Sequence, residues 1–201
     1  MLYLGTEINH QWSKSLEFEK RFQEYIEEFV VSGITYFSLL RPFREIKIVE
    51  LFTQYQKYFP LFSSCNKNFA MTNTRTEPFW CGQCPKCAFI FLLLAAFLDK
   101  EKVVSIFHKN LFADISLLST YKQILGIEGV KPFDCVGTPE ESLYALSRVI
   151  EHSEFTNDAV IVELTKLIGN QIGQIRKNGD KLLETLSLDT IPKVFHTIFG
   201  L

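Results

Sequence analysis

Apolar residues recur at helical spacing in the first part of the chain. Between Ser15 and Val30 they fall three or four positions apart, and Gly33 lies just beyond them, which predicts an amphipathic helix. A second helix is expected at about 43–58, with Pro60 just beyond its end.

Two short segments have the composition of strands. The stretch ITYFSLL (34–40) is β-branched and aromatic and is the best strand candidate, closed by Arg41-Pro42. The stretch VVSIF (103–107) fits a strand or the start of a helix equally well.

The longest apolar run, AFIFLLLAAFL (88–98), is apolar on nearly every side. A helix of this length spans roughly 16 Å, against ~30 Å of bilayer hydrocarbon, so a buried helix is expected rather than a membrane span. No basic segment followed by an apolar one is visible at the N-terminus, so we expect no signal peptide and a reducing cytoplasm.

The second half of the chain is patterned as helices joined by loops. A helix at about 114–125 should end at Gly126, and the glycines and prolines of 126–138 predict a loop. Thr138 and Glu141 form a capping-box pattern around Pro139, which predicts the start of another helix. Two or three further helices are expected within 157–199.

Composition narrows the functional classes. The chain has 201 residues, of which 47% are hydrophobic, and its formal net charge is −2. Because there is no basic excess to neutralise phosphates, nucleic-acid binding is not expected. The 19 phenylalanines favour a thick aromatic core or large buried interfaces.

Four of the five cysteines lie within 23 residues of one another, at Cys65, Cys81, Cys84 and Cys87. Four thiolates can surround one zinc ion tetrahedrally, and two-residue gaps with Gly82 and Pro85 suit the tight turns required. Such a site is closed, so its role would be structural, fastening the loop 65–81 to the start of the apolar helix at 86–98. An iron–sulfur cluster would use the same thiolates, and four buried, metal-free cysteines are the remaining alternative. Cys135 is expected to be a lone thiol.

Two polar stretches are candidates for ligand contact. The segment 9–15 gathers amides, an imidazole, hydroxyls and an ammonium group, although it also fits a helix start capped by a serine. Arg41 and Arg44 flank Pro42 at the end of the strand candidate, where arginine forks suit a carboxylate or phosphate, unless both are simply solvated. The chain has no Walker-type, dinucleotide-binding, metalloprotease or serine-hydrolase motif.

Four stretches together resemble one enzyme family. They are INHQWSKS (8–15), SCN (64–66), WCGQCPKCAF (80–89) and PFDCVGTPEE (132–141). In this order they resemble the C-terminal half of the ATP-dependent UDP-N-acetylmuramoyl-L-alanyl-L-glutamate epimerases of bacterial cell-wall synthesis. More distantly, Cys65 with the 81–87 triplet is similar to the zinc-binding end of 7-cyano-7-deazaguanine synthases and other PP-loop nucleotide enzymes.

The resemblance implies a reaction, its cofactors and its partners. Such an enzyme inverts the terminal L-Glu of a UDP-muramoyl dipeptide to D-Glu after ATP, with Mg²⁺, has adenylated a carboxylate. It implies proton transfer for His10 and substrate or anion binding for a wider set, namely Asn9, Gln11, Ser13, Lys14, Arg41 and Arg44. The family's SGGxDS-type nucleotide loop is missing, so an N-terminal half or subunit is the expected partner, and no membrane is involved.

The expected fold class is mainly α with one or two short strands, as the zinc-knotted C-terminal part of a PP-loop-like α/β enzyme. The expected domain is single and spans 1–201, with the zinc knot at 65–87 and a helical remainder at 114–201. Two other functions fit the same residues: the zinc-containing domain of another PP-loop nucleotide enzyme, and a non-enzymatic, zinc-stabilised helical module that binds a partner through its phenylalanines.

Overall fold

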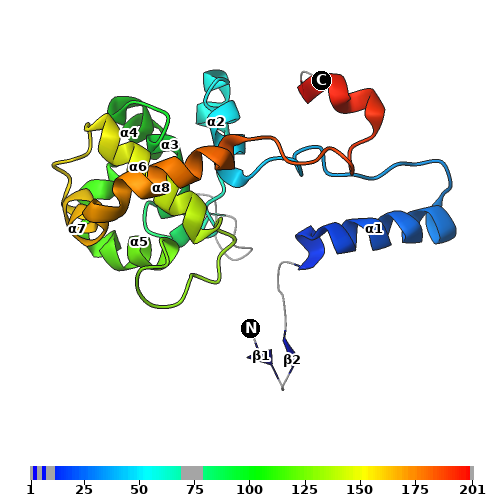
Figure 1. Cartoon of the computed structure of the whole chain (residues 1–201), viewed down its shortest axis with the longest axis horizontal. Coiled ribbons are helices and arrows are strands. Elements are labelled where there is room, and N and C mark those ends of the chain that lie inside the picture. Colours follow the sequence, from blue (N-terminus) through cyan, green and yellow to red (C-terminus); the bar gives the residue numbers. More distant parts are fainter. Residues whose placement is uncertain (1, 4–5, 8–11, 69–78, 200–201) are drawn as a thin grey trace. The chain divides into compact units, whose positions relative to one another are not determined.

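The computed structural model describes residues 2–3, 6–7, 12–68 and 79–199 of the chain. It divides into two compact units (Figure 1). One unit combines 1–42 with 185–201, and the other comprises 43–184.

The larger unit is built from helices. Its α-helices are α2 (Glu45–Phe52), α3 (Pro85–Ala95), α4 (Lys100–Phe107), α5 (Leu118–Ile124), α6 (Pro139–His152), α7 (Ala159–Ile168) and α8 (Ile172–Gly179). Short 3₁₀ helices join them, namely η3 (Gln56–Leu61), η4 (Leu111–Ala113), η5 (Ile115–Leu117), η6 (Gly169–Gln171) and η7 (Asp180–Leu183).

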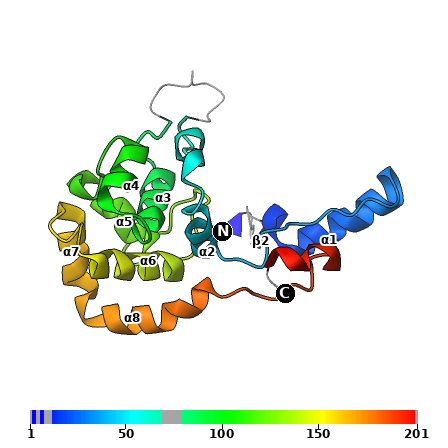
Figure 2. The ribbon, with the colours of Figure 1, turned by 90° about the horizontal axis from the view of Figure 1, so that it is seen from above.

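Helix α3 is the centre of this unit, and it confirms the buried helix expected from the apolar run. It begins after Cys84 with Pro85 in its first turn, where the missing N–H of proline costs nothing. From Cys87 onward nearly every side chain is buried, because α2, α4, α5 and α6 all pack against it (Figures 1 and 2). The ring of Phe91 meets Phe107 and Phe112 edge-on, with centroids 5.1 Å and 4.9 Å away. Phenylalanines therefore supply much of the core, as their number predicts.

Helix α6 begins at the capping box that the sequence predicts. The Thr138 hydroxyl accepts a hydrogen bond from the Glu141 N–H at 3.2 Å, and the Glu141 carboxylate accepts one from the Thr138 N–H at 2.9 Å. Glu141 is buried, and its second oxygen accepts a hydrogen bond from the N–H of Ile46 at 3.2 Å. One carboxylate thus accepts hydrogen bonds from backbone N–H groups at the starts of both α6 and α2, which come from distant parts of the chain. Helix α8 then lies alongside α6 (Figure 2).

The smaller unit contains α1 (Leu16–Tyr25), which runs into a π-helical turn, η2 (Ile26–Val30). Ser15 caps α1, since its hydroxyl accepts a hydrogen bond from the Phe18 N–H at 3.1 Å, and the helix ends before Gly33 as expected. The 3₁₀ helix η1 (Trp12–Lys14) precedes α1, and η8 (Lys193–Phe199) lies near the C-terminus. Strands β1 (Leu2–Tyr3) and β2 (Thr6–Glu7) pair antiparallel.

Several expectations about the fold are wrong. Residues 34–38 have no regular structure and 39–42 form a turn, so the strand predicted at 34–40 is not formed. The helix expected at 43–58 is shorter and continues as η3, which contains Pro60. The undecided segment 103–107 is helical, as part of α4.

The PP-loop-like α/β fold is also wrong. Among the described residues, the strands are the two-residue β1 and β2 alone, so there is no parallel sheet on which helices could pack in α/β layers. The described part of the chain is helical instead, held together by helix-on-helix packing around α3. No described helix has both the length and the apolar character needed to cross a bilayer.

Candidate functional site

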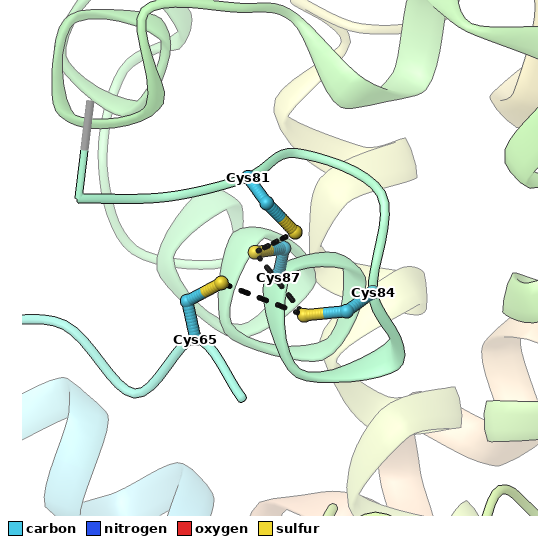
Figure 3. Close-up of side chains that lie close together, drawn as sticks. All are labelled: Cys65, Cys81, Cys84 and Cys87. Atoms are coloured by element: carbon cyan, nitrogen blue, oxygen red, sulfur yellow. Dashed lines mark hydrogen bonds between the residues drawn. The ribbon is translucent and has the colours of Figure 1, made fainter. Parts of the chain in front are cut away.

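The four clustered cysteines meet at one point beside the start of α3 (Figure 3). Their sulfur atoms all lie within 4.8 Å of one another. The Sγ atoms of Cys65 and Cys84 are 3.9 Å apart, those of Cys81 and Cys87 are 3.7 Å apart, and those of Cys84 and Cys87 are 3.4 Å apart. A tetrahedral ion with Zn–S bonds of ~2.3 Å separates its sulfurs by about 3.8 Å, so the donor set fits a single ion of this kind.

Local backbone geometry aims three of these sulfurs. Gly82 has a φ of +66°, the left-handed conformation that glycine adopts without strain, and it turns the chain between Cys81 and Cys84. Cys84 is the N-cap of α3, and Cys87 lies in the first turn of that helix. The positive end of the helix dipole therefore lies beside the cluster, where it favours thiolates.

Cys65 reaches the cluster from a separate segment. The Ser63 hydroxyl donates to the carbonyl of Phe79 at 2.7 Å and accepts from the N–H of Cys65 at 3.2 Å. These bonds join the Cys65 segment to the residues that immediately precede Cys81. Cys65 is fully buried, so the fourth sulfur is held away from solvent.

The electrostatics of the cluster show why it suits a cation. A hydrogen bond with the Cys87 side chain is the largest cause that lowers the pKa of Cys84, to about 5, and the backbone N–H of Cys87 contributes in the same direction. The same contact and burial raise the pKa of Cys87, and burial raises the pKa of Cys81. One thiolate is therefore favoured, whereas further negative charge requires a positive ion among the sulfurs.

The structure also brings together three of the four motifs noted in the sequence. The side chain of Asn66 donates a hydrogen bond to the carboxylate of Asp134. Gly137 lies so close to α3 that a Cβ atom there would come within 2.7 Å of the Phe89 ring. The SCN, WCGQCPKCAF and PFDCVGTPEE stretches thus form one neighbourhood, and Cys135 is outside the sulfur cluster. The Asn66–Asp134 bond was not expected, because no local pattern relates residues 68 positions apart.

The residues expected to bind substrate are only partly described. Asn9, His10 and Gln11 lie outside the described residues, and Ser13 and Lys14 are exposed in η1. Arg41 belongs to the smaller unit, and Arg44, the N-cap of α2, to the larger one. Arg41 donates from Nη1 to the carbonyl of Lys14 at 3.4 Å, so two of the expected residues meet.

A buried carboxylate that the sequence analysis missed holds Arg41. The Nε and Nη2 atoms of Arg41 donate to Oε2 of Glu19 at 3.0 Å and 2.5 Å, and the Glu19 side chain is only 3% exposed. Both residues line a cavity of about 640 Å³ between α1 and the segment 186–192. The sequence feature that could have indicated this burial is that Glu19 shares a helix face with Leu16 and Gln23.

Comparisons with known proteins identify one family, and its match includes the cysteine cluster and the 132–141 stretch. The family model described as the MurL C-terminal domain matches residues 61–178, and that of the MurL N-terminal domain matches residues 1–39. The UDP-N-acetyl-alpha-D-muramoyl-L-alanyl-L-glutamate epimerase of Xanthomonas oryzae pv. oryzae is 40% identical over 166 residues, which are 83% of this chain and 37% of the relative. Epimerases of the same name from a Micromonospora species and from Salinispora tropica are each 39% identical, over 84% and 82% of this chain.

The chain therefore spans little more than a third of the length of these curated relatives. No solved structure matches it significantly. The first family model alone covers more than half of the chain, and it includes the four cysteines and the 132–141 stretch that the structure places together. On this evidence the chain belongs to the MurL family.

Proposed function

We propose that this chain is part of an enzyme that inverts the terminal L-Glu of UDP-MurNAc-L-Ala-L-Glu to D-Glu, at the expense of ATP, during peptidoglycan precursor synthesis. The match of the MurL C-terminal domain to residues 61–178 carries the proposal. It is supported by the three relatives named as epimerases of this substrate. Because the chain spans about 37% of two of them, the activity is proposed for the chain together with a complementary polypeptide.

The chemistry explains why ATP would be consumed. The α-proton of a free glutamate is hard to remove because the neighbouring carboxylate is an anion. Transfer of AMP to that carboxylate, with release of pyrophosphate, gives an acyl adenylate that withdraws electrons strongly. A base can then remove the α-proton, an acid can return one to the opposite face, and hydrolysis releases AMP.

We assign the roles in this chain residue by residue. His10 is the candidate for proton transfer, with Asn9, Gln11, Ser13 and Lys14 in contact with the substrate. Arg41 and Arg44 are candidates for binding its anionic groups. The Arg41 guanidinium already binds Glu19, so it would contact the substrate as one half of this ion pair and not as a free cation.

We propose that Cys65, Cys81, Cys84 and Cys87 hold one structural zinc ion. The support is the match between the sulfur separations and a tetrahedral ion. In a [4Fe–4S] cluster each cysteine binds a different iron, and in a [2Fe–2S] cluster two cysteines bind each iron, so either cluster spreads the four sulfurs further apart than a single ion does. Four thiolates leave no open position, so the ion would fasten the Cys65 segment to α3 and take no part in the reaction. Because such thiolates must stay reduced, we place the protein in the cytoplasm.

The experiment combines this chain with the part of the Xanthomonas oryzae relative that has no counterpart in it. Both are incubated with ATP, Mg²⁺ and UDP-MurNAc-L-Ala-L-Glu, and the products are analysed for AMP and for the D-Glu epimer. We expect both products in the complete mixture. Their absence from a mixture in which both polypeptides are folded and associated would reject the epimerase proposal.

Variants separate the substrate-binding roles from folding. His10→Ala should lower turnover by at least about a hundredfold, whereas His152→Ala, an exposed residue in the last turn of α6, should leave it unchanged. Arg41→Ala should lower turnover without changing the zinc content, but it also leaves the buried Glu19 carboxylate unpaired, at a cost of roughly 3–5 kcal/mol. Lys14→Ala is therefore the cleaner test of substrate binding by the smaller unit, because the Lys14 side chain is exposed.

A further inference from the structure

The smaller unit exposes a group of large apolar side chains at the end of its long helix. Tyr25, Phe29, Val30, Val31, Ile34 and Tyr36, here called the apolar face, are each between 42% and 67% exposed. They come from the last turn of α1, from η2 and from the segment that follows. Six of twelve consecutive residues are therefore large, apolar and in contact with solvent.

Ring contacts connect the helix to the returning segment. The rings of Tyr25 and Phe29 lie 5.4 Å apart, and the ring of Phe22 meets Tyr36 edge-on at 4.9 Å. The π-helical turn, closed by a bond from the Val31 N–H to the Ile26 carbonyl at 2.9 Å, ends the helix within this group. These contacts hold the returning segment against the helix, and an exposed apolar group that is this close together in the chain is typical of a protein–protein contact.

The family comparison indicates which polypeptide covers it. The whole apolar face lies in the residues matched by the MurL N-terminal domain, which matches 1–39 and no other part of this chain. The Xanthomonas oryzae relative extends far beyond the part aligned here, since that part is 37% of its length. The exposed side chains therefore belong to the segment matched by the N-terminal domain, whereas most of the relative's length has no counterpart in this chain.

Charge argues against a second copy of this chain as the occupant. Glu24, Glu27 and Glu28 are exposed and interleave with the apolar residues. In a twofold dimer the same surface meets itself, so these carboxylates would face one another. An anionic membrane would be repelled in the same way.

We propose that the apolar face is the surface against which the part of a MurL protein that has no counterpart in this chain packs, with basic side chains around its own apolar contact. The inference rests on the proposed function, which already requires a complementary polypeptide, and adds where it binds. It holds whether that polypeptide is covalently continuous with this chain or a separate subunit.

The test measures association directly. The unaligned part of the Xanthomonas oryzae relative is purified with a tag and titrated with this chain by isothermal calorimetry. We expect a 1:1 complex whose Kd rises by at least about tenfold in the Phe29→Asp/Ile34→Asp variant. The matched control is Leu61→Asp/Val130→Asp, at residues of the larger unit that are 75% and 84% exposed, and it should change the Kd by less than about twofold.

A second measurement makes the result independent of variant folding. In the wild-type complex, hydrogen exchange at residues 25–36 should slow relative to the free chain, and far-UV circular dichroism should show that both variants keep their helices. The inference is overturned by the absence of a complex, by equal weakening in both variants, by unchanged exchange at 25–36, or by a self-associated chain that Phe29→Asp/Ile34→Asp converts to monomer.

The two proposals fail separately. A complex that forms through the apolar face and yields no D-Glu epimer removes the proposed function and leaves the inference standing. Turnover in a mixture that forms no such complex does the reverse.

Discussion

Cys84 has two structural roles, because it is the N-cap of α3 and its sulfur is one of the four in the cysteine cluster. Cys84→Ser keeps a side chain that can cap a helix but removes a soft metal ligand. We expect zinc to fall from about one equivalent to well below half, and the free energy of unfolding to fall by at least about 2 kcal/mol.

Elemental analysis of protein purified without chelator, together with urea denaturation, checks this prediction. Cys135→Ser is the matched control, since Cys135 is outside the cluster and should leave the zinc content unchanged. A wild-type protein that is folded and free of metal would contradict the zinc assignment altogether.

Two buried tyrosines of the larger unit should respond in opposite ways to removal of their hydroxyl groups. Tyr121 is fully buried, and among the described residues its hydroxyl has no hydrogen-bond partner. The Tyr144 hydroxyl donates to Asp180 at 2.9 Å and accepts from Arg176 at 2.5 Å. We expect Tyr121→Phe to be neutral or to stabilise by up to about 1 kcal/mol, and Tyr144→Phe to destabilise by about 1–2 kcal/mol, as measured by urea denaturation. The opposite order would show that Tyr121 has a partner such as a buried water.

The same tyrosines predict how stability depends on alkaline pH. Burial raises the pKa of both hydroxyls above the ordinary value of 10.0. The unfolded chain therefore loses these protons first, so stability that is present below about pH 10 falls as the pH rises further. In Tyr121→Phe this fall should be shallower, which denaturation curves between about pH 9 and 11 would show; an unchanged slope would assign the fall to other groups.

At the residue scale, the sequence predicts what depends on near neighbours. The capping box at Thr138 and Glu141 and the Ser15 cap are patterns within four residues, and both are formed. The cysteine spacing was equally informative about the sulfur cluster, because three of its four cysteines lie within seven residues. The Glu19–Arg41 pair was missed because its geometry depends on the tertiary path of the chain between two residues 22 positions apart.

At the scale of the elements, α3 is in close contact with the loop that holds Gly137. A Cβ atom on Gly137 would come within 2.7 Å of the Phe89 ring, which is fully buried in α3 and has no room to retreat. Gly137→Ala should therefore cost about 1–3 kcal/mol, measured by thermal or urea unfolding. Gly173→Ala, in α8 with no atom within 4 Å of its Cβ position, should instead stabilise by up to about 1 kcal/mol. Similar effects at both sites would contradict the close packing of the 132–141 stretch on α3.

Helices were easier to predict than the extended segment. The spacing of Phe18, Phe22 and Phe29 indicates a helix, and α1 with η2 occupies that range. The β-branched and aromatic residues of 34–40 favour a strand, but a strand exists only with a hydrogen-bonded neighbour, and the described residues provide none. Residues 103–107 became helical because Lys100–Phe107 packs as one element on α3, a contact that no local pattern contains.

On the scale of the whole molecule, the core belongs to one unit. The connected buried cluster runs from Ile46 to Leu182, so residues 43–184 contain both the core and the four cysteines. A fragment of 43–184 should therefore fold alone, bind one equivalent of zinc and unfold in a single cooperative transition by calorimetry. A fragment that lacks a transition or the metal would show that the smaller unit is needed for the fold.

The expected α/β architecture was the largest error. It came from a distant similarity in four cysteines to PP-loop enzymes, and a ligand set can be placed on unrelated backbones. The nearer resemblance depended on four motifs in order, and three of them are neighbours in the structure. Motifs that meet in space are thus the better guide to the family.

Helix α3 also determines the order in which this protein can assemble. Its partners α5 and α6 follow it along the chain, so at about 5–20 residues per second α3 remains without them for roughly 3–11 s until α6 has been synthesised. All four sulfurs, by contrast, have been synthesised by the first turn of that helix. We therefore expect the cysteines to bind the metal first and to hold the apolar helix α3 until the later helices bury it. Zinc starvation should then lower the yield of newly made protein before it affects molecules that are already folded.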